Sequence, residues 1–387
     1  MPSILQRPSR KRCGCVSLAA VALAAVFCPA TASAAFNPLE GAMGFNVFVT
    51  ENMALGGGHV EGATAVGGQL LVNGSGIYGM KSAGSYRLNS GDAVATSLLV
   101  DGGMVWSGSL NVGGRTLAST NENIQINTGW AALGDTAGTH YWGSSGREDW
   151  SATTASNYRL NGSTTSRDTT PGLLSNVSQA ALFIARDSAI VFADKAAQFR
   201  STSSTLSSLA DSYASKSFSG GTLNITLTQG TTNVVSLTAA EFQSVQNLNI
   251  SGTLGSNTGL IFDVSGTSVT FGSFNPVSVS LAAYILYNFS DATLVTMVDR
   301  SISGSILAPN AAFSRNAYDA NGQLVSSSTG NIDGQLVVAS YLQTGSGEIH
   351  NVLLDMTVVP EPAACAALLG GFALLVVWKR RQRRDPQ

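Results

Sequence analysis

A three-residue pattern of a β-branched residue, a polar residue and glycine recurs in the middle of the chain. The copies are Val60-Glu61-Gly62, Ile302-Ser303-Gly304 and Ile332-Asp333-Gly334, and a further apolar cluster follows each within a few residues. The last two copies lie 30 residues apart. This spacing suits one coil of a β-solenoid, in which glycine allows a sharp corner or a close backbone approach. The pattern favours a β-solenoid or β-helix-like body, and a β-sandwich whose glycines mark bulges is the alternative.

Short runs of alternating apolar and polar residues support a mainly β fold. Each run is broken by glycine or asparagine and predicts a strand that buries one face. The runs are Phe45/Val47/Val49, Leu223/Ile225/Leu227, Leu248/Ile250, Leu260/Phe262/Val264 and Val277/Val279/Leu281.

One segment, residues 187–215, has a helical period instead. Its apolar residues recur at steps of three, four or seven, which places them along one stripe of a helix. Asp187 is a candidate N-cap, and Gly220-Gly221 would stop the helix. We expect one long α-helix packed alongside the β body, with a mobile serine-rich linker at 201–208 as the alternative. The stripe consists of Phe192, Ala196, Phe199, Leu206, Leu209 and Tyr213.

The N-terminal residues 1–35 have the order of a secretory signal peptide. Four basic residues precede an apolar run over 16–27, and small residues follow it. The expected cleavage lies after Ala34 or Ala35 and requires signal peptidase. The apolar run is too short for a permanent membrane anchor.

The C-terminal residues 359–387 carry a second targeting pattern. Pro360, Glu361 and Pro362 precede 16 apolar or small residues, 363–378, and a basic tail follows at 379–387. Sixteen helical residues span about 24 Å, less than the roughly 30 Å hydrocarbon core. A transmembrane helix here suits a transient stop in the inner membrane, with its basic tail in the cytoplasm.

The segment between these ends is acidic and free of cysteine. Residues 36–359 hold 12 of the 21 basic and 21 of the 23 acidic residues, a formal charge of −9. This balance argues against a nucleic-acid partner. The chain's cysteines (Cys13, Cys15, Cys28, Cys365) all lie in the ends. The segment therefore has no disulfide, no thiolate metal site and no cysteine nucleophile.

Two resemblances follow from these residues. The Pro360-Glu361-Pro362 motif, apolar stretch and arginine tail resemble the PEP-CTERM sorting signal of Gram-negative bacteria, which an exosortase reads. Residues 36–358 resemble the choice-of-anchor A family, an adhesive domain with which no catalytic residues are associated. The segments that carry this second resemblance are FNVFV (45–49), HVEGATAVGG (59–68), ILYNFSDAT (285–293), SISGSILAPNAAFS (301–314) and GNIDGQLVVASYL with GEIHN (330–351).

Two pairs of histidine and glutamate could form a site if they meet in space. His59 and Glu61 lie two residues apart, as do Glu348 and His350, so each pair would point from one side of a strand. A metal site needs three or four converging ligands, and no helix-borne ligand motif is present. We therefore expect exposed or turn-lining polar residues, and no metal or cofactor.

Aromatic residues gather in a stretch rich in glycine, serine and threonine. Residues 121–171 have no clear period and are expected to be a loop-like insertion. The rings cannot all be core residues there and are candidate ligand contacts for sugars or proteins. A small cluster that holds the loop down is the alternative. The candidates are Trp130, Tyr141, Trp142 and Trp150.

Together these features predict a non-catalytic adhesive or structural protein of the cell surface or extracellular matrix. Its expected partners are signal peptidase and exosortase during export, the membrane transiently, and extracellular polysaccharide or another surface. The alternative is a carbohydrate-active enzyme, a lyase or glycosidase, on the same scaffold. Three or more acidic or histidine side chains converging in one groove would favour the enzyme.

Overall fold

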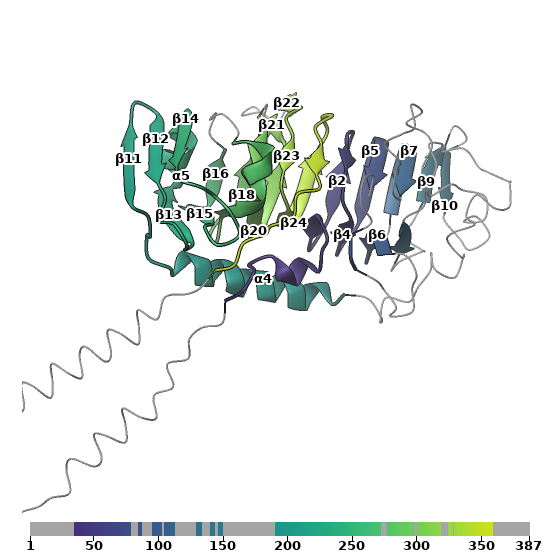
Figure 1. Cartoon of the computed structure of the whole chain (residues 1–387). Helices are drawn as coiled ribbons and strands as arrows, with labels where there is room; N and C mark the ends of the chain where they lie inside the picture. The colour runs from purple at the N-terminus through teal and green to yellow at the C-terminus, as the bar shows by residue number, and fades with distance from the viewer. Residues whose placement is uncertain are drawn as a thin grey trace, which may run out of the picture. The chain divides into compact units, whose positions relative to one another are not determined.

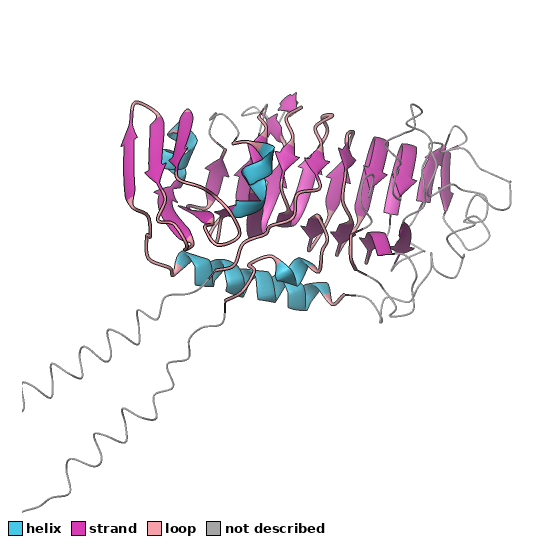
Figure 2. Ribbon diagram, in the orientation of Figure 1, coloured by secondary structure: helices cyan, strands magenta, loops and turns pink. Residues whose placement is uncertain are grey.

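The computed structural model describes residues 35–78, 84–86, 95–102, 104–112, 129–133, 140–143, 146–149, 190–271, 277–297, 300–318, 324–327 and 329–358. All of them lie in one compact unit, Ala35–Val359. The unit is mainly β, with parallel sheets and few helices (Figure 2).

Three ladders of parallel strands make up most of the unit (Figure 1). Ladder 1 contains, in order, β13 (Asn233–Thr238), β15 (Leu260–Ser265), β17 (Ile285–Asn288), the first part of β20 (Ser305–Ser314), the first part of β24 (Leu336–Gln343), β1 (Val47–Val49), β4 (Thr64–Val66), β6 (Ala95–Val100) and β8 (Gly129–Leu133). Ladder 2 contains β16 (Ser268–Thr270), β18 (Leu294–Thr296), the second parts of β20 and β24, β2 (Met53–Leu55), the first parts of β5 (Leu70–Tyr78) and β7 (Met104–Val112), and β9 (His140–Gly143). Ladder 3 contains β19 (Ile302–Ser303), β23 (Ile332–Asp333), β25 (Ile349–His350), β3 (His59–Val60) and the second parts of β5 and β7.

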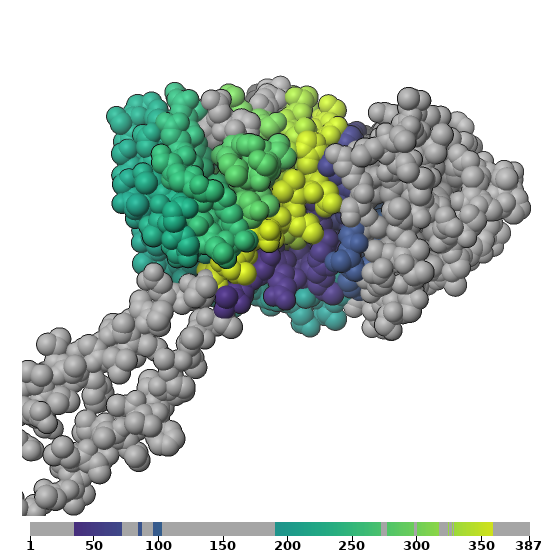
Figure 3. Space-filling model, in the orientation of Figure 1, coloured from purple at the N-terminus to yellow at the C-terminus, as the bar shows by residue number. Residues whose placement is uncertain are grey.

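The order of strands in the ladders differs from their order in the sequence. Val47 of β1 pairs with Leu336 of β24 on one side and with Thr64 of β4 on the other. The first strand among the described residues therefore lies inside ladder 1, and Figure 3 shows the purple N-terminal residues against the yellow C-terminal ones. Phe36 and Val358 form an antiparallel bridge, so the two ends of the described unit lie side by side.

Helix α4 (Phe192–Ser207) covers one side of ladder 1 and packs against β17, β20 and η1 (Glu40–Ala42) (Figure 1). β1, β4 and β17 of this ladder are buried on both sides, which is why β1 reads as continuous apolar residues. The predicted stripe is confirmed, because Phe192, Ala196, Phe199 and Leu206 are buried.

The helix is shorter than the predicted residues 187–215. Leu209 and Tyr213 lie beyond its end and are partly buried against the core. Ser212 forms an antiparallel bridge with Val234 of β13, so strand pairing takes over where a longer helix was expected. Val191 holds the N-cap position without a side-chain hydrogen bond, and Asp187 lies outside the described residues.

Two serines of α4, Ser203 and Ser207, are part of the packing rather than of a linker. Ser203 Oγ donates to Asn288 Oδ1 at 2.6 Å, and Asn288 Nδ2 lies 3.0 Å from Ser207 Oγ. Asn288 Nδ2 also donates to Asp263 Oδ1 at 2.7 Å, and Ser207 Oγ donates to the same oxygen at 2.7 Å. The polar end of the helix is therefore matched to a polar position of ladder 1.

The recurring glycine pattern marks ladder 3. Ile302 pairs with Ile332 in parallel register, Ile332 pairs with Ile349, and Ile349 pairs with Val60. These residues are at most 2% exposed. All three copies therefore lie in ladder 3, two of them paired directly and the third across Ile349, and the parallel pairing differs from the antiparallel sheets of a β-sandwich.

The glycines of this pattern allow the close backbone approach that the sequence predicted. A Cβ atom on Gly334 would overlap the backbone carbonyl of Gly304 and lie 2.8 Å from Ser305 N. Gly304 has φ +136°, which L side chains rarely adopt.

We expect Gly334→Ala to destabilise the protein by about 1–3 kcal/mol, because backbone atoms cannot move aside as a side chain can. Thermal unfolding followed by circular dichroism measures the effect. Gly255→Ala is the matched control: nothing lies within 4 Å of a Cβ there, and the change should stay within about 0.5 kcal/mol. Equal effects of the two substitutions would contradict the close approach of the backbone at Gly334 to that at Gly304.

Smaller elements complete the unit. A further sheet contains β11 (Ser215–Ser219), β12 (Thr222–Thr226) and β14 (Asn247–Ser251), and it accounts for the predicted strands at 223–227 and 248–250. The others are α5 (Ala239–Ser244), which begins with a capping box, the hairpin of β21 (Asn316–Tyr318) and β22 (Leu324–Ser327), and β10 (Gly146–Asp149) against β9.

The strand predicted at Val277/Val279/Leu281 is wrong. Residues Val279–Tyr284 form a 3-10 helix, η3, in which Leu281 N donates to Ser278 O at 2.8 Å. The three-residue step buries Ala282 and leaves Val279 51% exposed, so the alternation of apolar residues does not correspond to a buried face.

The predicted terminal segments cannot be followed in the structure. Among the described residues, no helix has the length and apolar character needed to span a bilayer. The predicted signal helix and the predicted span at 363–378 lie outside those residues.

Candidate functional site

Ladder 2 has a regular outer face built by strands that pair in register. Strand alternation turns Val295, Phe313, Tyr341, Met53 and Leu70 inward, where each is at most 2% exposed. Their neighbours along each strand point outward and lie in register across the ladder.

These outward residues form two rows that we call the outer face. They are small or uncharged, and their exposure is intermediate or high. One row is Ser268, Leu294, Ala312 and Ser340; the other is Thr270, Thr296, Ser314, Leu342, Ala54 and Leu71.

The outer face combines hydroxyl groups with exposed aliphatic groups. Thr270, Thr296 and Ser314 stand side by side on adjacent strands, whereas Leu294 is 40% and Leu71 43% exposed. A hollow of about 750 Å³ lies over the face, and among the described residues that line it Glu51 alone is charged. Such a surface suits contact with an uncharged partner, because no charge on the rows has to be desolvated.

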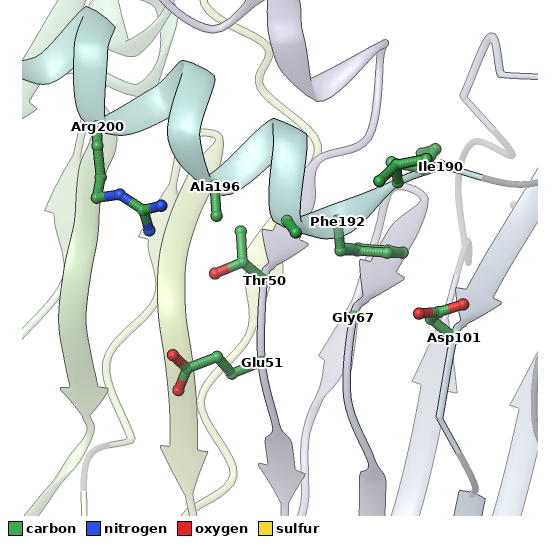
Figure 4. A pocket seen from close by; sticks show the side chains of 10 residues that line it. Thr50, Glu51, Gly67, Asp101, Ile190, Phe192, Ala196 and Arg200 are labelled. Carbon is green, nitrogen blue, oxygen red and sulfur yellow. The ribbon is translucent and has the colours of Figure 1, made fainter.

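A second hollow of about 660 Å³ lies between α4 and ladder 1 (Figure 4). Arg200 and Phe192 line it from the helix, and Glu51 and Asp101 line it from the turns after β1 and β6. The ring of Phe192 lies so close to Gly67 that a Cβ there would be 2.7 Å from it. This lining of one cation and two carboxylates does not single out a class of ligand.

The two predicted histidine–glutamate pairs meet on ladder 3. Val60 pairs with Ile349, so the residues that flank them point to the same side. His59 Nε2 lies 2.9 Å and His350 Nε2 lies 3.1 Å from Glu348 Oε2. His350 Nε2 lies 4.0 Å from Glu61 Oε1. We call these four residues the histidine–carboxylate cluster.

The cluster differs from the expected exposed or turn-lining polar residues. Glu61 is 5% exposed, and one of its oxygens accepts a hydrogen bond from Asn351 N at 3.1 Å. His350 Nδ1 contacts Asp333 Oδ1, and Asp333 is also 5% exposed. The sequence alone could not predict this arrangement, because parallel pairing of β3 with β25 joins residues from opposite ends of the unit.

The carboxylates around His350 favour its protonated form. Burial alone would lower the pKa of His350, but the hydrogen bond to Asp333, the charge of Glu61 and the hydrogen bond to Glu348 outweigh it. The pKa of His350 therefore lies above its ordinary value.

A buried glutamine holds the turn that leads to the cluster. Gln343 Oε1 accepts from Arg315 Nη1 at 2.8 Å and from Tyr341 Oη at 2.5 Å. Its Nε2 lies 2.8 Å from Gly345 O and 3.1 Å from Gly57 O. Gly57 and Gly345 shortly precede His59 and Glu348, so this network fixes both strands of the cluster. Sequence reasoning missed it, since a single glutamine and arginine carry no pattern.

The predicted ligand-contact aromatics are placed only by their backbone. Trp130 lies on β8, and Tyr141 and Trp142 lie on β9. Their side chains and Trp150 lie outside the described residues, as do Ala34 and the motif Pro360, Glu361 and Pro362. Ala35 is the first described residue. The stretch 121–171, expected to be loop-like, contains β8, β9 and β10.

Comparison with known proteins gives one match. A family model described as "Putative Ice-binding-like adhesive domain" matches residues 38–351, which include the described strands of all three ladders. Neither the curated proteins nor the solved structures contain a match to this chain.

Proposed function

Because the chain belongs to this family of ice-binding-like adhesive domains, we propose that it is an exported, exosortase-sorted surface or extracellular-matrix protein with a non-catalytic adhesive role. The outer face of ladder 2 is the adhesive surface. The observation that carries the proposal is the pair of uncharged outward rows, held in register by parallel pairing across β16, β18, β20, β24, β2 and β5.

The chemistry of the rows defines the partner. Hydroxyl groups of Thr270 and Thr296 can exchange hydrogen bonds with hydroxyls of a partner, and Leu294 and Leu71 can cover its apolar patches. An extended, uncharged and hydroxyl-bearing surface offers both kinds of group. We therefore propose extracellular polysaccharide as the partner.

Stacking of the ladders supports the expected β-solenoid body. The chain passes from β18 to β19 to β20 and from β23 to β24 to β25, so it visits the ladders in turn and repeatedly. The outward residues of each coil stand beside those of the next coil. The adhesive surface therefore grows with the number of coils.

A binding panel tests the adhesive role. Fluorescently labelled full-length protein is applied to immobilised bacterial polysaccharides, polycrystalline ice and an albumin-coated surface. The proposal predicts saturable retention on at least one uncharged polysaccharide and washing off from albumin. Retention on ice alone would mean that the outer face binds ice rather than polysaccharide. Equal retention on all the surfaces would contradict a specific adhesive role.

Export and sorting are proposed from the two ends of the sequence. Signal peptidase removes residues 1–34 or 1–35, and an exosortase acts at Pro360-Glu361-Pro362 after a transient stop in the inner membrane. We expect the mass of the mature protein, measured by mass spectrometry on the secreted product, to lack the basic tail. Persistence of Lys379 to Arg384 in that product would contradict the sorting step.

The histidine–carboxylate cluster favours a second candidate, a carbohydrate-active enzyme. Glu61, Glu348 and the two histidines converge as such a site requires. Purified protein is incubated with the polysaccharides of the panel, and new reducing ends and unsaturated products are measured. Turnover that Glu348→Gln abolishes would replace the adhesive proposal by the enzyme, whereas the adhesive proposal predicts no product.

A further inference from the structure

The histidine–carboxylate cluster brings four metal-ligand side chains together from two strands. His59 and Glu61 flank Val60 on one strand, and Glu348 and His350 flank Ile349 on its partner. One ligand atom from each of His59, Glu61 and Glu348 lies within 4.8 Å of the others.

The distances between donor atoms fit the edges of a small coordination shell. Ligands about 2.0–2.1 Å from a tetrahedral zinc ion lie about 3.3 Å from each other. The observed separations are 2.9 Å for His59 Nε2 to Glu348 Oε2, 3.1 Å for His350 Nε2 to Glu348 Oε2, and 4.0 Å for His350 Nε2 to Glu61 Oε1. We propose that this cluster binds a divalent transition-metal ion of the zinc type, with His59, Glu61 and Glu348 as the ligands that already lie together and His350, 3.1 Å from Glu348, as the fourth ligand that the ion draws in.

Neighbouring groups orient the ligands. Asp333 contacts His350 Nδ1, so the ring can hold its proton there and turn the Nε2 lone pair to the ion. Ser303 Oγ donates to the other oxygen of Asp333 at 3.3 Å. Asn351 N donates to Glu61 Oε2 at 3.1 Å, which leaves Oε1 on the side of the cluster. A carboxylate behind a ligating histidine is the usual support of a metal site.

The donor set selects the class of metal. Two imidazole nitrogens with two carboxylate oxygens suit Zn²⁺ and its first-row neighbours, whereas Ca²⁺ and Mg²⁺ prefer shells made of oxygen. Ion binding would join β3 to β25, two strands that the chain connects only through the rest of the unit. We therefore expect the ion to raise the melting temperature of the protein.

Titration calorimetry tests the site directly. Full-length protein, with its four cysteines replaced by serine to exclude thiolate binding, is stripped with chelator and titrated with ZnCl₂. We expect one ion per chain, visible Co²⁺ absorption bands of tetrahedral type and a higher melting temperature with Zn²⁺ than with CaCl₂. Asp333→Asn should weaken binding about 10- to 100-fold, since it removes support without removing a ligand.

Matched variants separate this site from other zinc binding. His59→Ala and Glu348→Gln should each weaken binding at least as much as Asp333→Asn, whereas His140→Ala and Glu51→Gln should leave it unchanged. Circular dichroism without metal checks that each variant folds. If His59→Ala does not fold, His59→Gln takes its place in the titration. Failure of the cysteine-free protein to bind Zn²⁺, or equal binding by His59→Ala and His140→Ala, would overturn the site. Neither result bears on adhesion by the outer face of ladder 2.

Discussion

Replacing Phe48 with alanine is expected to lower the free energy of unfolding by about 3–5 kcal/mol. The side chain is fully buried, and its ring centroid lies 5.2 Å from that of Phe192 and 5.3 Å from that of Phe199. The change removes contacts that hold α4 against β1. It also leaves a cavity that cannot close, because β1 is paired on both sides. Urea unfolding followed by circular dichroism measures the loss.

The matched control for Phe48→Ala is Phe218→Ala. Phe218 lies on β11 and is 41% exposed, so its removal should cost less than about 1 kcal/mol. If Phe48→Ala cost no more than this control, the packing of α4 on ladder 1 would be wrong.

A double substitution on the outer face, Ala312→Glu with Leu71→Glu, should reduce attachment at least about tenfold, which corresponds to about 1.4 kcal/mol. Both residues are exposed, so folding should change little. An uncharged partner cannot pair with the new carboxylates, and each must be desolvated when the face is covered. Adsorption isotherms on the polysaccharide that retains the wild-type protein give the ratio of affinities.

The control places the same charges elsewhere. Ala197 and Ser204 are exposed on α4, and Ala197→Glu with Ser204→Glu adds the same net charge. This variant should attach as the wild-type protein does. Equal losses in both double variants would mean that net charge, rather than the outer face, controls attachment.

The local features of the fold could be predicted from the sequence. Ile302 and Ile332 lie 30 residues apart in the sequence and pair in the structure. The apolar stripe from Phe192 to Leu206 is buried on one side of α4. Both signals are local or have a fixed period, so they do not depend on which strands become neighbours.

The order of the strands within the ladders could not be predicted from local patterns. β1 lies between β24 and β4, and no local pattern encodes the pairing of Val47 with Leu336. The outer face depends on the same long-range register: Leu342 and Ala54 stand side by side although they are far apart in the sequence.

The sequence predicted the two halves of the histidine–carboxylate cluster separately. The spacing of His59 with Glu61 and of Glu348 with His350 placed each pair on one side of a strand, and the structure brings the pairs together. The sequence did not link Asp333 to these pairs, because its contact with His350 depends on the pairing of β23 with β25. The serines of α4 left a linker open as the alternative for the same reason, since the partners of Ser203 and Ser207, Asn288 and Asp263, are distant in the sequence.

Hydroxyl-radical footprinting tests the adhesive face most directly. Full-length protein is oxidised with and without the polysaccharide that retains it, and the modified side chains are located by mass spectrometry. The account predicts that Leu294, Leu342 and Leu71, on every second strand from β18 through β24 to β5 in ladder 2, are protected together. Protection confined to Trp130, Tyr141, Trp142 and Trp150, with these three leucines oxidised as in the free protein, would contradict it.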